Sequence, residues 1–476
     1  MDYELLVIGG GAAGLAAATT AAGDGMRVAL VSDGPLGGDC TFTGCVPSKT
    51  LIAAAAQGST FGDAMRRVRA TVGDIAATET APLLRRAGVE VIGGRARVVG
   101  GGAVTVDGTR LAAGAIIIAT GSQPAIPPID GLADTPFLTT DTVFELRDKP
   151  DSMAILGAGP VGCELAQAFC RLGVDVCVVD TADRLLPGID ADAAAVLTEV
   201  FVREGIRVHT NSRVDAVYGN DKVVTLRLND NRTVTAAQLL VATGRVPDTK
   251  GLDLAAAGVR TDEQGFITVD RHLATTAADV FAVGDVTGLF PHTHAAYAMG
   301  RDAVGAARHR LRRPSFDPGA IPRVIFTDPE IGVVGSDGRN IGTAGARVAY
   351  LPFAELDRAI IAGRVDGFVK IVAGPRPVLR NLGGGRILGA TIVAPHAGEM
   401  IHEPALAMRT RMFTGRLAQA IHAYPSWSMA IQQAAAQFFG EFGGRRAQLV
   451  QPESSAALAD LRSVTSGTLA ADGGAA

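Results

Sequence analysis

Two glycine-rich turns, each set between an expected strand and an expected helix, constrain the fold of this chain most strongly. The first follows the apolar strand YELLVI and carries Gly9, Gly11 and Gly14; a helical run, LAAATTAAGDG, and a second strand, RVALV, come next. Such glycines let the backbone approach a pyrophosphate, and the N-terminus of the helix faces its negative charge. A G-x-G-x-x-G pattern inside a complete strand–turn–helix–strand unit predicts a dinucleotide-binding domain of the Rossmann type.

A second unit of the same kind begins where the strand MAIL leads into GAGPVG at 157–162. A helix, ELAQAFCRLG, and a strand, VDVCVVD, follow, and the strand ends in Asp180. An acid at this place suits the free ribose hydroxyls of NAD and repels a 2′-phosphate. The first unit has Ser32 there, with Asp33 one residue later, which leaves its ribose contact open. Two dinucleotide folds predict two dinucleotides, with electrons passing between them.

Later segments extend this plan and then depart from it. AIIIATGSQP (115–124) and LLVATGRVPD (239–248) are typical of strands that end in glycine turns. DVFAVGDVTG (279–288) predicts a strand that ends in an acid, Asp285, suited to a ribityl or ribose hydroxyl. From residue 321 onward, strand-like IPRVIFTDPEIGVVG, GFVKIV and ILGATIV precede helical sequence, which predicts an α+β domain.

Composition and charge restrict the partners of the chain. Its 476 residues carry a formal net charge of −4, so nucleic acid and anionic membranes are not expected as partners. The chain opens on the acidic Met-Asp-Tyr-Glu, and no uncharged run approaches the roughly 20 apolar residues that span a bilayer. We therefore expect a cytoplasmic protein, in a reducing compartment where structural disulfides are rare.

A close pair of cysteines, Cys40 and Cys45, lies in the stretch GGDCTFTGCVPSK. A zinc site needs further ligands, but Cys163, Cys170 and Cys177 belong to a helix and a strand of another segment. Those three are expected to be small buried hydrophobic residues. Redox chemistry explains the close pair better than a structural disulfide or a metal site does, and no metal site is predicted.

These stretches together resemble the FAD-dependent pyridine nucleotide–disulfide oxidoreductases, the group of dihydrolipoamide dehydrogenase, glutathione reductase and mercuric reductase. The resemblance covers about residues 3 to 445. GGDCTFTGCVPSK is similar to the redox-disulfide motif of that family, and GAGPVGCELAQAF, ATGRVP, VFAVGDVTG and VIFTDPEIGVVG follow in the family's order. The stretches TDPE and GPVGCELAQ resemble the mercuric-reductase-like branch of the family in particular. The family fold has two Rossmann-type dinucleotide-binding domains and a C-terminal α+β dimerisation domain, so we expect this α/β fold and a homodimer.

The resemblance also implies a division of the chain and its cofactors, FAD and NAD(H). The expected parts are an FAD-binding domain at 1–148 with a second part at 271–320, an NAD-binding domain at 149–270, a dimerisation domain at 321–450 and a disordered tail at 451–476, which is rich in Ala, Ser and Gly.

Catalytic roles follow from the same resemblance. Cys45 is implied to be the sulfur nearest the flavin, forming a charge-transfer pair with it, and Cys40 to be the interchange thiol. From the sequence itself, Cys45 begins a helix with Pro47 in its first turn, where the helix dipole lowers the pKa of a thiol. Lys49 lies on the same helix face, four residues later. In the family this lysine pairs with the glutamate after the second fingerprint, here Glu164.

Binding residues are carried over position by position. The FAD set is Gly9, Gly11, Gly14, Lys49, Thr120, Gly121, Ser122, Asp285 and Thr293, with Asp33 added from its place beside Ser32. The nicotinamide nucleotide set is Gly157, Gly159, Gly162, Asp180, Val214 and Gly244. Arg184 matches a family position beside the adenosine, with an ordinary solvated arginine as the equal alternative.

The clearest departure from the family lies in IHAYPSWSMAIQQ. Tyr424 stands where the family has the acid–base histidine that the second subunit supplies, and Met429 stands where it has a glutamate. Tyrosine is a poor base near neutral pH, with an ordinary pKa of about 10. His422 comes two residues early, and a structural role is expected for it. The chain has no cysteine after Cys177, whereas mercuric reductases carry a further C-terminal pair.

The sequence thus predicts an NADH-oxidising FAD enzyme that reduces its Cys40–Cys45 disulfide. Its small-molecule acceptor would be a disulfide, a reactive sulfur species, a quinone or a metal ion. A first alternative is a quinone or dye reductase in which the flavin passes electrons on directly. A second alternative is a flavoprotein redox sensor whose cysteine pair switches a surface without turnover.

Overall fold

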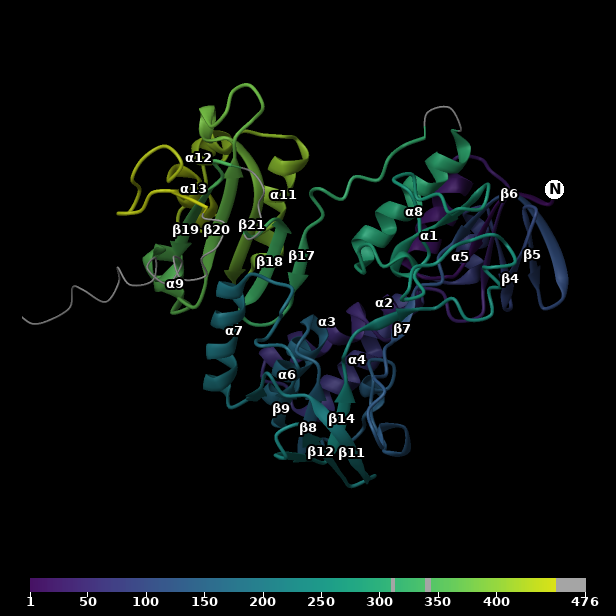
Figure 1. Cartoon of the computed structure of the whole chain (residues 1–476), viewed down its shortest axis with the longest axis horizontal. Helices are drawn as coiled ribbons and strands as arrows, with labels where there is room; N and C mark the ends of the chain where they lie inside the picture. The colour runs from purple at the N-terminus through teal and green to yellow at the C-terminus, as the bar shows by residue number, and fades with distance from the viewer. Residues whose placement is uncertain (310–312, 339–343, 451–476) are drawn as a thin grey trace, which may run out of the picture. The chain divides into compact units, whose positions relative to one another are not determined.

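The computed structural model describes residues 1–309, 313–338 and 344–450. It contains two compact units, Met1–Pro329 and Glu330–Ala476 (Figure 1). Both dinucleotide motifs lie in the first unit. The predicted tail at 451–476 lies outside the described residues. The finer division into FAD-binding, NAD-binding and dimerisation parts stays a prediction.

The first sheet of unit 1 has the order β3-β2-β1-β6-β5-β4, and a seventh strand, β16, also pairs with β6. Its strands are β1 Tyr3–Ile8, β2 Val28–Ser32, β3 Val89–Gly93, β4 Ala96–Gly100, β5 Ala103–Val106, β6 Thr109–Ile118 and β16 Val280–Ala282. Strands β1, β2, β3, β6 and β16 pair in parallel, and the apolar runs of β1, β2, β16 and the second half of β6 are buried, as expected for a sheet covered on both faces.

Two helices cover one face of this sheet, α1 at Ala12–Gly23 and α8 at Thr293–Arg308 (Figure 1). They approach closely because Gly300 on α8 lies over the backbone of Ala13 on α1, where any side chain would collide with the Ala13 carbonyl. On the opposite face, side chains of β1, β2 and β6 form a second core with side chains of β4, of β5 and of the segment around Leu252–Val259. Because parallel strands end at one edge, the turns that follow β1, β6 and β16 meet there: Ile8 pairs with Ile118, and Ile118 with Ala282.

The second sheet of unit 1 is fully parallel, in the order β10-β9-β8-β14. Its elements are β8 Ser152–Leu156, α6 Pro160–Arg171, β9 Asp175–Val179, α7 Ala191–Glu204, β10 Arg207–His209 and β14 Gln238–Val241, with an antiparallel sheet of β11 Val214–Asn220, β12 Val223–Leu228 and β13 Thr233–Ala236 packed beside it. Strands β7 Ser122–Pro124 and β15 Arg245–Pro247 then pair antiparallel and join the turns that follow β6 and β14.

The cysteine pair lies on two consecutive helices, α2 Gly38–Phe42 and α3 Cys45–Ala56, and α4 Phe61–Ala76, α5 Ala81–Arg86 and the short strand β17 Arg323–Ile325 complete the regular elements of unit 1. Single turns of 3₁₀ helix occur at Leu132–Asp134, Val143–Glu145 and Gly284–Thr287.

Unit 2 contains an antiparallel sheet in which β18, β21, β20, β19 and β22 follow one another. Its elements are β18 Glu330–Gly335, β19 Arg347–Pro352, α9 Asp357–Ala362, β20 Phe368–Gly374, β21 Arg386–Ala394, α10 Ala397–Met400, α11 His402–Arg409, α12 Thr414–Gln419, α13 Met429–Ala436 and β22 Gln448–Leu449. Buried side chains of α11 and α13 face this sheet. The predicted fold class, two Rossmann-type units followed by an α+β domain, is confirmed.

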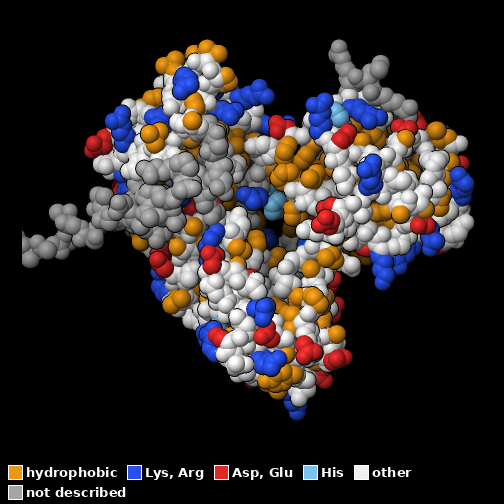
Figure 2. Space-filling view, viewed as in Figure 1, with side chains coloured by type: hydrophobic (Ala, Val, Ile, Leu, Met, Phe, Trp, Pro, Cys, Tyr) orange, Lys and Arg blue, Asp and Glu red, His pale blue; other side chains and the backbone are white. Residues whose placement is uncertain are grey.

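The surface agrees with the weak net charge. Acidic and basic side chains are interspersed over the face shown in Figure 2. Within the described ranges, no helix is both long and apolar enough to cross a membrane.

Candidate active site

The first glycine turn, between β1 and α1, leaves space for a ligand. Gly9 adopts a positive φ of 111°, and a side chain on Gly14 would overlap the carbonyl oxygen of Gly9. Gly11 is different: a Cβ built on it meets nothing within 4 Å. The outer glycines are thus required by the turn itself, whereas the middle one is required only if a ligand approaches its backbone. This geometry fits the pyrophosphate of FAD.

The second turn, between β8 and α6, repeats the geometry at Gly157, Gly159 and Gly162. Gly157 has a φ of 116°, a side chain on Gly162 would overlap the Gly157 carbonyl, and Gly159 again faces open space. Leu156 pairs with both Val179 and Val241, so the chain segments after β8, β9 and β14 meet at one edge. The residues fit a second dinucleotide at this edge.

The predicted ribose acid Asp180 lies directly after β9, at this edge. Its carboxylate accepts backbone N–H groups from Ala158 in the glycine turn at 2.5 Å and from Ala182 at 2.7 Å. A carboxylate has about four acceptor sites, so two remain for hydroxyl groups. Val214 begins β11 and is buried, and Gly244 adopts a φ of 134° in the turn after β14. The guanidinium of Arg184 donates to the carbonyl of Pro187 at 3.0 Å.

At the edge of the first sheet, the predicted FAD residues converge with one arginine. Ser122 Oγ donates to Asp285 Oδ2 at 2.8 Å, and Arg245 Nε donates to Ser122 Oγ at 2.7 Å. Arg245 also forms an ion pair with Asp39, the residue before Cys40. Sequence reasoning missed Arg245, although it directly follows Gly244 in the ATGRVP motif. Thr120 Oγ1, also in the predicted set, donates to the carbonyl of Asp248 at 2.6 Å, and Gly121 has a φ of 77°.

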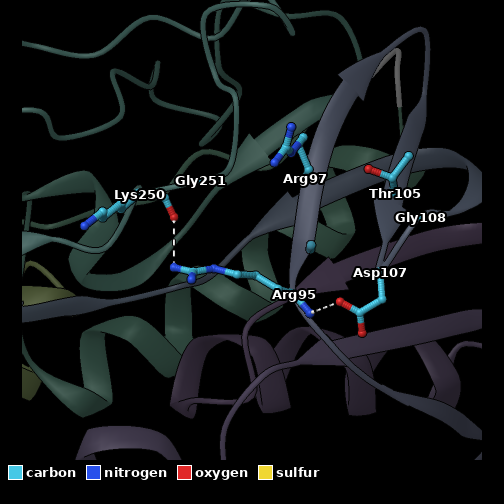
Figure 3. A pocket seen from close by; sticks show the side chains of 8 residues that line it. Arg95, Arg97, Thr105, Asp107, Gly108, Lys250 and Gly251 are labelled. Atoms are coloured by element: carbon cyan, nitrogen blue, oxygen red, sulfur yellow. Dashed lines mark hydrogen bonds between the residues drawn. The ribbon is translucent and has the colours of Figure 1, made fainter.

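A surface pocket of about 550 Å³ opens beside β4 and β5. Figure 3 shows its lining, in which Arg95, Arg97 and Lys250 contribute cations and Asp107 one carboxylate. Arg95 donates to the carbonyl of Lys250 at 3.3 Å. Burial and the nearby Asp33 raise the pKa of Asp248, whereas Arg95 lowers it. Arg95 and the predicted FAD contact Asp33 therefore act on the same carboxyl group.

The two cysteines are free, half-buried thiols on consecutive helices. Cys45 is the first residue of α3, as predicted, and its Sγ lies 3.2 Å from the hydroxyl oxygen of Thr293 at the start of α8. Gly44 lets the chain turn between the two helices, because a Cβ there would lie 2.8 Å from the carbonyl oxygen of Asp39. The structure thus brings Cys40, Cys45 and Thr293 together.

The environment separates the two thiols in acidity. A hydrogen bond from Cys40, the Thr293 hydroxyl and the charge of Lys49 lower the pKa of Cys45 to about 6, against burial and Glu164. The same hydrogen bond to Cys45, together with burial, raises the pKa of Cys40 well above its ordinary value. A singly protonated pair therefore carries its proton on Cys40 and its negative charge on Cys45.

Lys49 and Glu164 form the expected ion pair. Lys49 Nζ donates to Glu164 Oε2 at 2.7 Å, and the other oxygen of Glu164 accepts the backbone N–H of Phe326 at 2.8 Å. Glu164 is 4% exposed and its position on α6 brings it to Lys49 on α3. The Lys49 ammonium also lies 4.8 Å from the ring centroid of Phe326. Each carboxylate oxygen of Glu164 thus has a hydrogen-bond partner, which fixes the carboxylate beside α3.

Tyr424, in unit 2, is 67% exposed and donates its O–H to Asp357 at 2.9 Å. That hydrogen bond to a carboxylate raises the pKa of Tyr424 further from neutrality. His422 has both ring nitrogens engaged, Nδ1 with the carbonyl of Ala420 and Nε2 with the carboxylate of Glu403, each at 3.1 Å. His422 therefore has a contact at each ring nitrogen, and the hydrogen bond to Asp357 makes Tyr424 a still poorer base at neutral pH.

Known proteins with similar sequences and structures are flavoprotein or pyridine nucleotide oxidoreductases, in agreement with the two dinucleotide turns and the cysteine pair. Residues 3–300 match the pyridine nucleotide-disulphide oxidoreductases, and residues 321–435 match the dimerisation domain of the same group. The dihydrolipoyl dehydrogenase of Chlamydia pneumoniae is 32% identical over 452 residues, which cover 90% of this chain and 95% of that protein. An NAD(P)H dehydrogenase (quinone) of Mycobacterium tuberculosis is 33% identical over 475 residues, with 91% and 94% covered. Among solved structures, a Cu(II) complex of RclA, an HOCl-induced flavoprotein disulfide reductase from Escherichia coli, has a TM-score of 0.83 at 28% identity, with 92% and 99% covered.

Proposed function

Because this chain belongs to the pyridine nucleotide-disulphide oxidoreductase family, we propose that it oxidises NADH and reduces its own Cys40–Cys45 disulfide, which then reduces a small acceptor. The family is dependent on FAD and NAD(P)H, so the chain is an oxidoreductase with these two cofactors. The observation that carries the finer proposal is the redox pair itself. Both thiols are free, Cys45 lies at the N-terminus of α3, and the pKa of Cys45 is lowered whereas that of Cys40 is raised.

FAD, when bound, would accept a hydride from the nicotinamide and supply two electrons to the disulfide. Gly11 and Gly159 would admit the two pyrophosphates, since each faces open space. Reduction of the disulfide by two electrons and one proton gives a thiol and a thiolate. Lys49 and Thr293 stabilise the thiolate at Cys45, and the proton stays on Cys40.

The acceptor class follows from the missing base. With Tyr424 in the place of the histidine, general acid–base help worth typically 10²–10⁴-fold is absent at that position. We propose that the acceptor is a small disulfide that brings its own acid group, a reactive sulfur species, a metal ion or a quinone. The Escherichia coli neighbour was solved as a Cu(II) complex and is HOCl-induced, which supports testing metal ions and oxidised sulfur species first.

One alternative has direct support among the relatives. The mycobacterial protein is an NAD(P)H dehydrogenase (quinone), which favours a second candidate function in which quinones or dyes take electrons directly from the flavin and the cysteines are not needed. A redox sensor without turnover is the third candidate. The satisfied Lys49–Glu164 pair favours turnover over sensing, because it places a fixed charge beside Cys45.

Steady-state NADH oxidation by the FAD-loaded protein tests the three candidates. The acceptors to compare are small disulfides, hypothiocyanite, Cu(II), Hg(II) and quinones, with Cys45→Ser and Cys40→Ser as test variants. Cys170→Ser is the matched control, because this half-buried cysteine lies on α6 and contacts the carbonyl of Glu204. We expect both test variants to lose most of the activity and the control to keep it. Wild-type rates in both test variants with every acceptor would establish the direct flavin route, and no turnover with any acceptor would leave the sensor.

We further propose that the protein is a cytoplasmic homodimer that assembles through residues 321–450, a proposal that the match to a dimerisation domain supports. Light scattering of the purified protein should give twice the mass of the chain. A monomer at micromolar concentration would contradict this proposal.

A further inference from the structure

The residues on either side of Cys40 are each held by a side chain from a distant segment. Asp39 precedes Cys40 on α2 and forms an ion pair with Arg245 from the turn after β14. Thr41 follows Cys40, is 2% exposed, and donates its hydroxyl to Glu79 Oε2 at 2.7 Å. The helical turn that carries the interchange thiol is therefore fixed from both sides.

The two contacts differ in charge. Arg245 neutralises Asp39, and its Nε also lies 3.9 Å from Asp285. Glu79, by contrast, forms no ion pair among the described residues. It is only partly exposed, in the segment between α4 and α5, and its carboxylate lies against Gly37, where a side chain would collide with Oε2. A carboxylate that forms no ion pair among the described residues is thus bonded to Thr41, the residue that follows Cys40.

We propose that Glu79 is a positioning residue for the redox pair: bonded to Thr41, it keeps a negative charge near Cys40 and so adds to the preference of the thiolate of the reduced pair for Cys45. The inference rests on the proposed function, because it concerns the reduced state of the disulfide. Like charges repel, so a thiolate at Cys40 costs more when Glu79 is ionised. Glu79 accordingly adds to the raised pKa of Cys40, after the contact with Cys45 and burial.

The other groups around the pair do not act on Cys40 alone. Lys49 from α3 and Glu164 from α6 act on Cys45 with opposite signs, and Thr293 from α8 lowers the pKa of both thiols. Removing the charge of Glu79 should therefore affect Cys40 selectively.

The alkylation rate of Cys40 by iodoacetamide tests this inference, because only the thiolate reacts. The experiment uses the FAD-loaded Cys45→Ser protein, so that Cys40 titrates alone, and follows the Cys40 peptide by mass spectrometry from pH 6 to about 10. Glu79→Gln removes the charge but keeps an oxygen that can accept the Thr41 hydroxyl. Asp74→Asn, an exposed position near the end of α4, is the control with the same change in charge.

We expect Glu79→Gln to shift the alkylation profile of Cys40 to lower pH by about one unit, which is about a tenfold higher rate below the midpoint. The control should leave the profile unchanged. Thr41→Val keeps the charge but releases the carboxylate, and should give a smaller shift in the same direction. Identical profiles for Glu79→Gln and Asp74→Asn overturn the inference, and so does an unshifted Thr41→Val profile if Glu79→Gln fails to fold. The assay needs no acceptor, so a failure of the proposed turnover does not affect it.

Discussion

Substitutions in the Lys49–Glu164 pair should shift the pKa of Cys45 in opposite directions, and measuring these shifts is the most decisive test of the site. Lys49→Met removes a positive charge, and Glu164→Gln removes a negative charge while keeping an oxygen for the Phe326 N–H. Since Lys49 lowers the pKa of Cys45 and Glu164 raises it, the two single variants should shift that pKa in opposite directions. The double variant should return it close to the wild-type value.

The expected size follows from the exposure of the pair. Residues four apart on a helix have Cβ atoms about 5–6 Å apart, and two unit charges at that separation interact by about 3 kcal/mol at an effective dielectric constant of about 20. The Lys49 side chain is 35% exposed, so solvent screening reduces its effect, and we take about half of that value. This corresponds to about one pH unit for each single variant.

The assay is the long-wavelength absorbance between the Cys45 thiolate and the flavin, titrated with pH in the anaerobic two-electron-reduced protein. The pKa of Cys45 is lowered to about 6, so the thiolate is present above that pH and the absorbance should disappear as the pH falls through it. Lys49→Met should move the midpoint to about 7 and Glu164→Gln to about 5, given a shift of about one unit each. Lys149→Met, a lysine bonded to the carbonyl of Gly173, is the control and should not move it. Shifts of the same sign in both single variants would refute this reasoning.

Three further outcomes are expected. In a comparison of kcat/KM with one acceptor, NADH should exceed NADPH by at least about tenfold because Asp180 repels a 2′-phosphate; equal values contradict this. Gly159→Ala should fold, since φ there is −72°, but should raise the KM for NADH with FAD content unchanged, whereas Gly11→Ala should lower the FAD content measured by absorbance. Tyr424→His with Met429→Glu should raise lipoamide turnover by roughly 10²–10⁴-fold, with a new pKa near 6–7 in the rate profile. Family-typical lipoamide rates in the natural protein would instead assign the acid–base role to Tyr424 or His422.

The parts of the site that sequence could predict are those that depend on local chemistry. The glycine turns follow from φ values and close approach within a few residues, as Gly9 and Gly14 show, and Cys45 at the start of α3 follows from its neighbours. Lys49 and Glu164 are 115 positions apart, and only the family resemblance connected them.

What the sequence could not give are contacts between distant segments with no motif of their own. Glu79 lies in a polar stretch between two helices, and nothing around it in the sequence indicates that it bonds to Thr41, 38 positions away. The same is true of Asp39, whose partner Arg245 is separated from it by 206 positions. Arg245 at least belongs to a recognisable motif, whereas the contacts of Glu79 depend on how the segment after α4 folds over α2.

Two features of the site keep Cys40 protonated, whereas a disulfide-exchange enzyme needs this thiol to lose its proton: the raised pKa of Cys40 and the tyrosine at the position of the base. An exchange thiol reacts as the thiolate, so it benefits from a base that removes its proton. Here the base position holds a tyrosine whose pKa is raised by Asp357, and the carboxylate of Glu79 is bonded to Thr41, the residue that follows Cys40. Around Cys45 the balance is reversed, because Lys49 and Thr293 favour the anion. A reduced pair arranged in this way stores its negative charge next to the flavin site and keeps its outer thiol protonated. We therefore expect such a pair to suit an acceptor that carries its own acid–base group or takes electrons without attack by Cys40, and to disfavour dihydrolipoamide and glutathione as efficient partners.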